Sequence, residues 1–199
     1  MAVLKPVGTP RSLRSDAARK PALWLALLVA ILSPLIGVVP AIAQNDTLEY
    51  AIKAAYLYKF TPFIEWPASA FAGPTSPFYV CILGGDPFGS TLDQALSDHQ
   101  VGEHPVKLRR LRTVDTAADC HILYLGTAPA QEAAAALAKV RGSPVLTVTE
   151  QNRGVAGGVV QFVVKGGHVR FTIDAGAAST NRVVISAKLL SLAASVKGS

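Results

Sequence analysis

The stretch from Pro77 to Gly89 constrains the fold more than any other part of the chain. Phe78–Leu83 is an uncharged run of apolar and aromatic residues, too short for an ordinary helix and typical of a strand buried on both faces. Gly84-Gly85 then permits a sharp turn. Asp86-Pro87 is typical of a helix start, with an N-cap oxygen and proline at the first helical position. The stretch therefore predicts a strand, a glycine turn and a helix N-terminus.

Further strands and helices alternate with this unit. Short apolar or alternating runs indicate three more strands, at residues 105–109, 120–125 and 144–148. Helical segments lie between them, the clearest being the alanine-rich residues 130–140. This alternation predicts an α/β fold with a mainly parallel central sheet, strand order 2-1-3-4, and helices on both faces.

The last third of the chain changes pattern. Two β-rich runs, 159–164 and 168–173, are joined by a short connection with two glycines and predict an antiparallel hairpin. Arg170 and Thr172 lie on its polar face. Apolar residues at helical spacing then predict a final helix over about 181–196.

An aromatic helix is predicted to open the folded part. It begins at Asn45 or Asp46 and extends to about Ile64, with apolar residues at helical spacing. Tyr58 and Trp66 add aromatic surface. One interpretation is that these rings cover the sheet; the other is that part of them contacts another protein.

Residues 1–43 are typical of a secretory signal peptide. A basic leader precedes an apolar run over 22–39, and Ala41-Ile42-Ala43 has the small-x-small pattern of a cleavage site. The alternative is an uncleaved membrane anchor, although the run is shorter than the ~20 residues that span a bilayer. We expect cleavage near Ala43, export to the periplasm, and a single α/β domain over residues 44–199.

The net charge does not indicate a nucleic-acid partner. The chain carries +6, but the leader holds five Lys/Arg and one Asp, so only +2 remains in residues 44–199. No run of like charge occurs there.

Cys81 and Cys120 are the only cysteines. In an exported protein an even pair favours a disulfide, and the predicted strand order places their strands side by side. The alternative is two buried free thiols.

No motif in the chain points clearly to catalysis, ligand binding or metal binding. Gly84, Gly85 and Asp86 lie beyond a strand's carboxyl end, where α/β sheets bind ligands, but neither a GxGxxG motif nor a P-loop lysine accompanies them, which favours a purely structural turn. His99 and His104 do not complete a metal site, and neither a nucleophile elbow nor a carboxylate pair is evident. We therefore expect neither cofactor nor metal, and no enzymatic activity.

Several segments together resemble one family of exported proteins. They are Lys53–Phe60, Phe63–Pro67, Cys81–Gly89, Leu146–Val148, Gly157–Asp174 and Ile185–Leu190. This set, which extends over nearly all of residues 44–199, resembles the YfiR family of periplasmic regulators, including its HmsC-like members.

The resemblance implies a repressor that binds the periplasmic domain of a membrane diguanylate cyclase, and so lowers cyclic di-GMP and biofilm formation. It also implies a homodimer and a family disulfide at Cys81 and Cys120. A second cysteine pair that some members carry near the hairpin is absent. Tyr58, Trp66, Arg170 and Thr172 are the candidate contact residues. The alternative function is a sensor module that binds a small ligand beside Gly84–Asp86.

Overall fold

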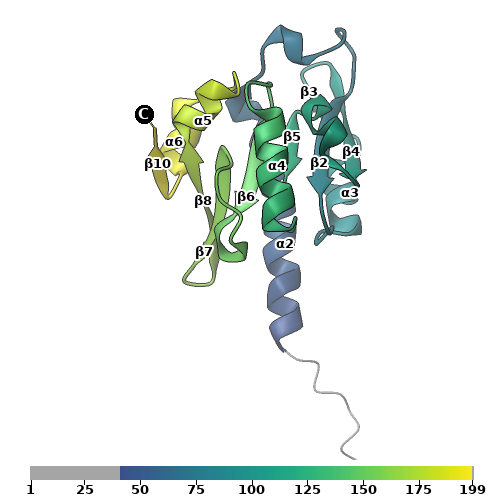
Figure 1. Cartoon of the computed structure of the whole chain (residues 1–199). Coiled ribbons are helices and arrows are strands. Elements are labelled where there is room, and N and C mark those ends of the chain that lie inside the picture. Colours follow the sequence, from purple (N-terminus) through teal and green to yellow (C-terminus); the bar gives the residue numbers. More distant parts are fainter. Residues whose placement is uncertain (1–40, 199) are drawn as a thin grey trace, which may run out of the picture. The chain divides into compact units, whose positions relative to one another are not determined.

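Strand β2 (Phe78–Leu83) lies inside an eight-stranded sheet, with β4 on one side and β5 on the other. The computed structural model describes residues 41–198 (Figure 1). The predicted signal peptide lies almost wholly outside these residues. The α/β class, with mostly parallel strands and an antiparallel hairpin, is confirmed.

The strands of the large sheet follow the order β10-β8-β7-β6-β5-β2-β4-β3. Strands β4, β2, β5, β6 and β7 are mutually parallel, β8 is antiparallel to β7, and β3 is antiparallel to β4. The bounds are β3 Gln100–Val101, β4 His104–Leu111, β5 Ile122–Tyr124, β6 Leu146–Glu150, β7 Val160–Lys165, β8 His168–Asp174 and β10 Ser195–Lys197.

Helices pack on both faces of the sheet, as predicted. Alternate residues of the central strands enter two separate cores: Val80 and Ile82 pack on the α2 side, Cys81 and Leu83 on the α4 side. Figure 1 shows α4 in front of the sheet. The helices are α2 Ala41–Lys59, α3 Ser90–Leu96, α4 Ala130–Val140, α5 Ala175–Thr180 and α6 Ala187–Leu192.

The first helix is shorter at its C-terminal end than predicted. It ends at Lys59, and a 3-10 turn (Thr61–Phe63) leads into the two-residue strand β1 (Ile64–Glu65). Pro62 lacks the N–H that a continuing helix needs. Strand β1 instead pairs with β9 (Val184–Ile185).

The helix predicted to start at Asp86-Pro87 begins later. Helix α3 starts at Ser90, because the Asp86 side chain closes a local turn onto the N–H groups of Phe88 and Gly89. An Asx turn of this kind competes with helix capping. The helix-start prediction is therefore wrong by about one turn.

The single C-terminal helix predicted over 181–196 is wrong. The chain forms β9, then α6, then the edge strand β10. Arg182 adopts a left-handed φ of 53°, which ends helical structure after α5. Ser186 then caps α6, its hydroxyl accepting the N–H of Leu189. Apolar spacing alone did not reveal these breaks.

Candidate functional site

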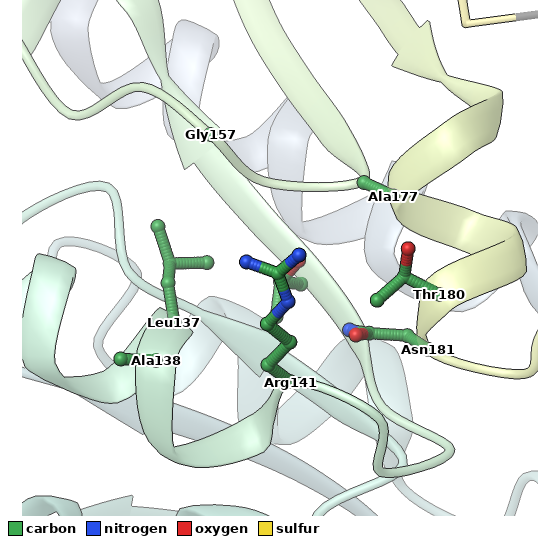
Figure 2. Close-up of a pocket in the computed structure, with 8 residues that line it drawn as sticks. Leu137, Ala138, Arg141, Gly157, Ala177, Thr180 and Asn181 are labelled. Atoms are coloured by element: carbon green, nitrogen blue, oxygen red, sulfur yellow. The ribbon is translucent and has the colours of Figure 1, made fainter.

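A cleft of about 450 Å³ lies between α4 and α5 (Figure 2). Leu137, Ala138 and Arg141 line one wall, and Ala177, Thr180 and Asn181 line the other, with Thr147 and Gly157 between them. The Arg141 side chain extends into the space between the two walls. No sequence motif indicated this site, because its lining residues come from separate elements.

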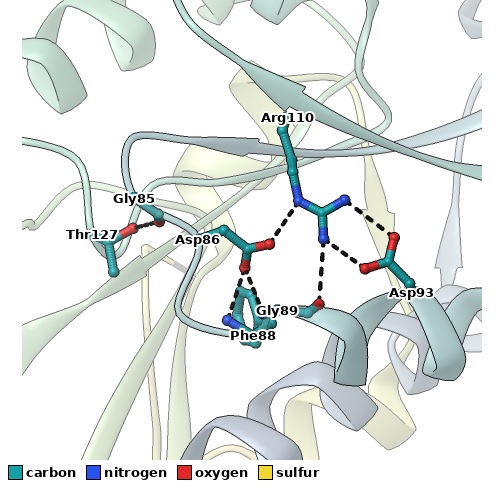
Figure 3. A network of polar contacts seen from close by, with 7 residues as sticks. All are labelled: Gly85, Asp86, Phe88, Gly89, Asp93, Arg110 and Thr127. Atoms are coloured by element: carbon teal, nitrogen blue, oxygen red, sulfur yellow. Dashed lines mark hydrogen bonds and ion pairs between the residues drawn. The ribbon is translucent and has the colours of Figure 1, made fainter.

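The turn after β2 is held by a network of charged groups (Figure 3). Asp86 Oδ1 accepts the N–H groups of Phe88 and Gly89, at 2.8 and 3.2 Å, and Oδ2 pairs with Arg110 Nε at 2.7 Å. Arg110, on β4, also pairs with Asp93 of α3 at 2.7 Å. Hydrogen bonding to Arg110 lowers the pKa of Asp93. The network ties β2, β4 and α3 together at this end of the sheet.

The two glycines of the same turn lie against the loop that contains Thr127 and Ala128. Gly84 has a φ of +90°, and a Cβ there would lie 2.7 Å from the Cα of Ala128. The Gly85 carbonyl accepts the Thr127 hydroxyl. Asp86 already pairs with Arg110, so the polar groups of the turn find their partners largely within the protein. The ligand crevice beside Gly84–Asp86 stays a prediction.

Charged groups that the sequence analysis did not single out are buried under α2. Lys53 Nζ lies 2.8 Å from Glu150 Oε2 and close to Glu49, and the side chains of Lys53 and Glu150 are only 2% and 3% exposed. The Tyr124 hydroxyl donates to the second Glu150 oxygen. A lysine on the apolar stripe of a helix was the available signal, since Lys53 lies beside Ala54 and one turn from Leu57.

The surroundings of this cluster favour a structural role. Burial, followed by the charge of Glu150, raises the pKa of Tyr124, so its proton stays available for the hydrogen bond. Tyr50 packs beside Lys53, whose Nζ lies 4.6 Å from the ring centroid. Its buried hydroxyl makes no hydrogen bond of regular geometry within the described residues. The cluster links α2 to the carboxyl ends of β5 and β6.

The predicted disulfide is confirmed. Cys81 on β2 and Cys120, just before β5, are bonded, with 5.9 Å between their Cα atoms. Both cysteines are buried in the α4-side core. The bond therefore joins two neighbouring elements beneath the helix layer.

His121, which follows the disulfide, is buried in a stack of rings. Phe71 and Phe78 lie on it with ring centroids at 4.7 and 4.6 Å. Its Nδ1 accepts the Tyr79 N–H at 3.0 Å, and its Nε2 lies 3.1 Å from the Ala70 carbonyl. These partners fix the neutral tautomer with the proton on Nε2. Desolvation by burial lowers the pKa of His121 to about 4.

The two candidate aromatic residues are largely engaged within the fold. Tyr58 stacks on His99 with 4.0 Å between ring centroids. Trp66 packs edge-on against Phe78, and its Nε1 donates to the His121 carbonyl at 3.3 Å. Both side chains are half-buried.

The hairpin residues lie apart from these rings. Arg170 is exposed and Thr172 half-buried on β8, and both point away from the core that receives Phe171. His99, the partner of Tyr58, precedes the edge strand β3, and five strands lie between β8 and β3 in the sheet order. The four candidate contact residues therefore do not form one patch.

Helix α2 carries an exposed apolar flank. Leu48 and Ile52, one turn apart, are 63% and 39% exposed. A hollow of about 220 Å³ continues this flank toward the end of the helix, lined by Ile52, Ala55, Tyr56 and Lys59. Exposed apolar side chains that adjoin one another are typical of protein contacts.

Residues 41–198 contain no group of three or more His, Cys, Asp or Glu side chains placed to hold a metal ion. Among the helices of the same part of the chain, none has the length and apolar character needed to cross a membrane.

Fold and site together define a disulfide-linked α/β domain whose buried charges pair with one another. The family described as YfiR/HmsC-like matches residues 50–194, and the chain belongs to this family. No curated protein matches the chain. The family consists of periplasmic regulators rather than enzymes.

Proposed function

We propose that this protein represses an inner-membrane diguanylate cyclase by binding the cyclase's periplasmic domain, which lowers cyclic di-GMP and biofilm formation. Membership of the YfiR/HmsC-like family is the observation that carries this proposal. The buried disulfide suits an exported protein. The mature form begins near Gln44, acts in the periplasm without a catalytic residue or cofactor, and forms a homodimer.

Two separate surfaces of this protein contact the cyclase: the polar face of the hairpin and the apolar flank of α2. Arg170 is exposed on β8, and Leu48 and Ile52 are exposed on α2. Tyr58 and Trp66 contribute only the parts of their half-buried rings that their internal partners leave exposed. A few side chains at the desolvated centre of such a contact supply most of the binding free energy, while a charge at its rim adds specificity.

A second candidate function is a sensor module that binds a small ligand. The cleft between α4 and α5 is the observation that favours it, because its volume of about 450 Å³ falls within the range of ligand pockets. The two functions are compatible if the ligand controls release of the cyclase.

The test is capture of the partner from membranes. The protein secreted from the full-length gene, immobilised after purification from the periplasm, should retain a diguanylate cyclase, identified by mass spectrometry. Ile52→Glu places a charge on the apolar flank, and Arg170→Glu reverses a charge on the hairpin. Each should weaken capture by about tenfold, the equivalent of ~1.4 kcal/mol.

Arg112→Glu is the matched control, since Arg112 is an exposed arginine outside both surfaces. All three variants must retain the melting temperature of the unmodified protein for the comparison to count. Equal capture by all of them would contradict the proposed surfaces. Retention of other membrane proteins, with the cyclases consistently missing, would contradict the proposed function.

A further inference from the structure

The cleft between α4 and α5 contains a positive charge without an internal partner. The guanidinium of Arg141, just past the end of α4, makes no hydrogen bond or ion pair with any residue in the described range 41–198, and only the backbone N–H of Arg141 is bonded, to the Ala138 carbonyl. Its side chain is exposed to solvent and lies between the two walls of the cleft (Figure 2). A guanidinium presents a planar fork of donors that matches a carboxylate.

The walls around Arg141 are fixed in place by hydrogen bonds that do not involve it. Asn181 Nδ2 donates to the Val145 carbonyl at 2.9 Å, and Asn181 Oδ1 accepts the Gly142 N–H at 3.3 Å. Arg182 Nε donates to the Gly142 carbonyl at 2.8 Å. These bonds connect the turn after α4 to the end of α5. The cleft is therefore formed before any ligand arrives, which reduces the cost of binding.

The cleft also offers a polar floor and an apolar wall. Thr147, only 1% exposed, accepts the Val159 N–H at 2.9 Å, which leaves its own hydroxyl proton free to donate. Leu137 and Ala177 supply apolar surface on opposite sides. Gly157 has a φ of +95°, a conformation that other residues rarely adopt, and a Cβ there would be in ordinary contact with Leu137 of α4.

We propose that this cleft binds a small organic carboxylate, with Arg141 holding the carboxylate and Leu137 and Ala177 contacting the apolar body. The positive charge selects an anion, and the apolar wall selects a molecule larger than an inorganic ion. A volume of about 450 Å³ accommodates a compact molecule with one ring or a short chain. This inference is independent of the identity of the membrane partner.

The test uses butyrate and benzoate as probes, with benzamide as the uncharged counterpart of benzoate. In titrations followed by calorimetry and by NMR of the full secreted protein, both carboxylates should bind saturably and shift the Arg141 side-chain and Thr147 amide signals. Benzamide should bind at least about tenfold more weakly, because it lacks the charge that the guanidinium pairs with.

Arg141→Gln should weaken benzoate binding by about tenfold or more, whereas Arg112→Gln, which removes an exposed arginine elsewhere, should leave it unchanged. The signal shifts in the unmodified protein identify the site even if a variant proves unstable. Failure of both carboxylates to bind, equal binding of benzamide, or signal shifts confined to residues outside the cleft would each overturn the proposal.

Discussion

His121 shows how one buried side chain makes the stability of this domain depend on pH. Its Nδ1 accepts the Tyr79 N–H, so protonation of Nδ1 would break that bond and place a charge among aromatic rings. The folded state therefore holds the pKa at about 4, below the ordinary value of 6.5. Between these two values the unfolded chain binds the proton and the folded chain does not.

We predict that the free energy of unfolding falls as the pH is lowered from 6.5 to 4, by up to ~3 kcal/mol. The contribution of His121 is fully present above pH 6.5 and is lost below about pH 4. Urea unfolding at a series of pH values measures it.

Two substitutions separate this effect from other titrations. His121→Phe keeps a ring in the stack and should flatten the pH dependence, although the loss of two hydrogen bonds lowers stability throughout. His168→Asn alters an exposed histidine and should leave the dependence unchanged. If the free energy of unfolding depended equally on pH in all three proteins, the assignment of this dependence to His121 would be contradicted.

Single residues differed in how far the sequence disclosed their roles. Cys81 and Cys120 could be paired, because a chain with only two cysteines leaves one intramolecular pairing and their predicted strands were neighbours. The two ion pairs of Arg110 could not be predicted, because only the turn after β2 brings Asp86 and Asp93 close to Arg110. Contacts of this kind depend on loop geometry that local patterns do not encode.

At the scale of elements, the attachment of α2 to the sheet depends on a buried ion pair. Lys53 from α2 meets Glu150 at the end of β6, and both side chains are almost fully buried. Removing one partner of such a pair leaves an uncompensated charge in the interior. We predict that Lys53→Met, which nearly preserves side-chain volume, lowers the free energy of unfolding by about 3 kcal/mol.

Urea unfolding measures the free energy of unfolding of Lys53→Met and of the control variant Lys59→Met. Lys59 is a matched control because it is an exposed lysine of the same helix. The double variant Lys53→Met with Glu150→Gln should recover part of the loss, because the buried carboxylate is then neutral. Equal stabilities for the two single variants would show that the pair contributes nothing to the docking of α2.

A segment of uniform helix-forming composition was predictable, whereas the breaks within an apolar pattern were not. Residues 130–140 form α4 with the bounds that their composition indicated, since an alanine-rich segment has one favourable conformation. The prediction of one helix over 181–196 was wrong. The apolar spacing fits a helix, but Arg182 and Ser186 interrupt it. Pairing of β9 with β1, distant in sequence, overrode the local preference.

For the whole molecule, the sequence predicted the α/β class and the family but not the cleft between α4 and α5. Alternating strands and helices are a repeated pattern, whereas Leu137, Arg141 and Asn181 converge only when α4 and α5 fold onto the sheet. The candidate contact residues were likewise chosen one by one, and the fold separated Tyr58 from Arg170.

Cellular cyclic di-GMP is the direct readout of repression of a diguanylate cyclase. It should be measured in cells that lack this gene, in cells that lack the captured cyclase, and in cells that lack both. A repressor of the cyclase predicts a rise in cyclic di-GMP and surface attachment in the first strain, and no rise in the double deletion. Unchanged cyclic di-GMP in the first strain, while the intact strain produces both proteins, would contradict repression of the cyclase by this protein.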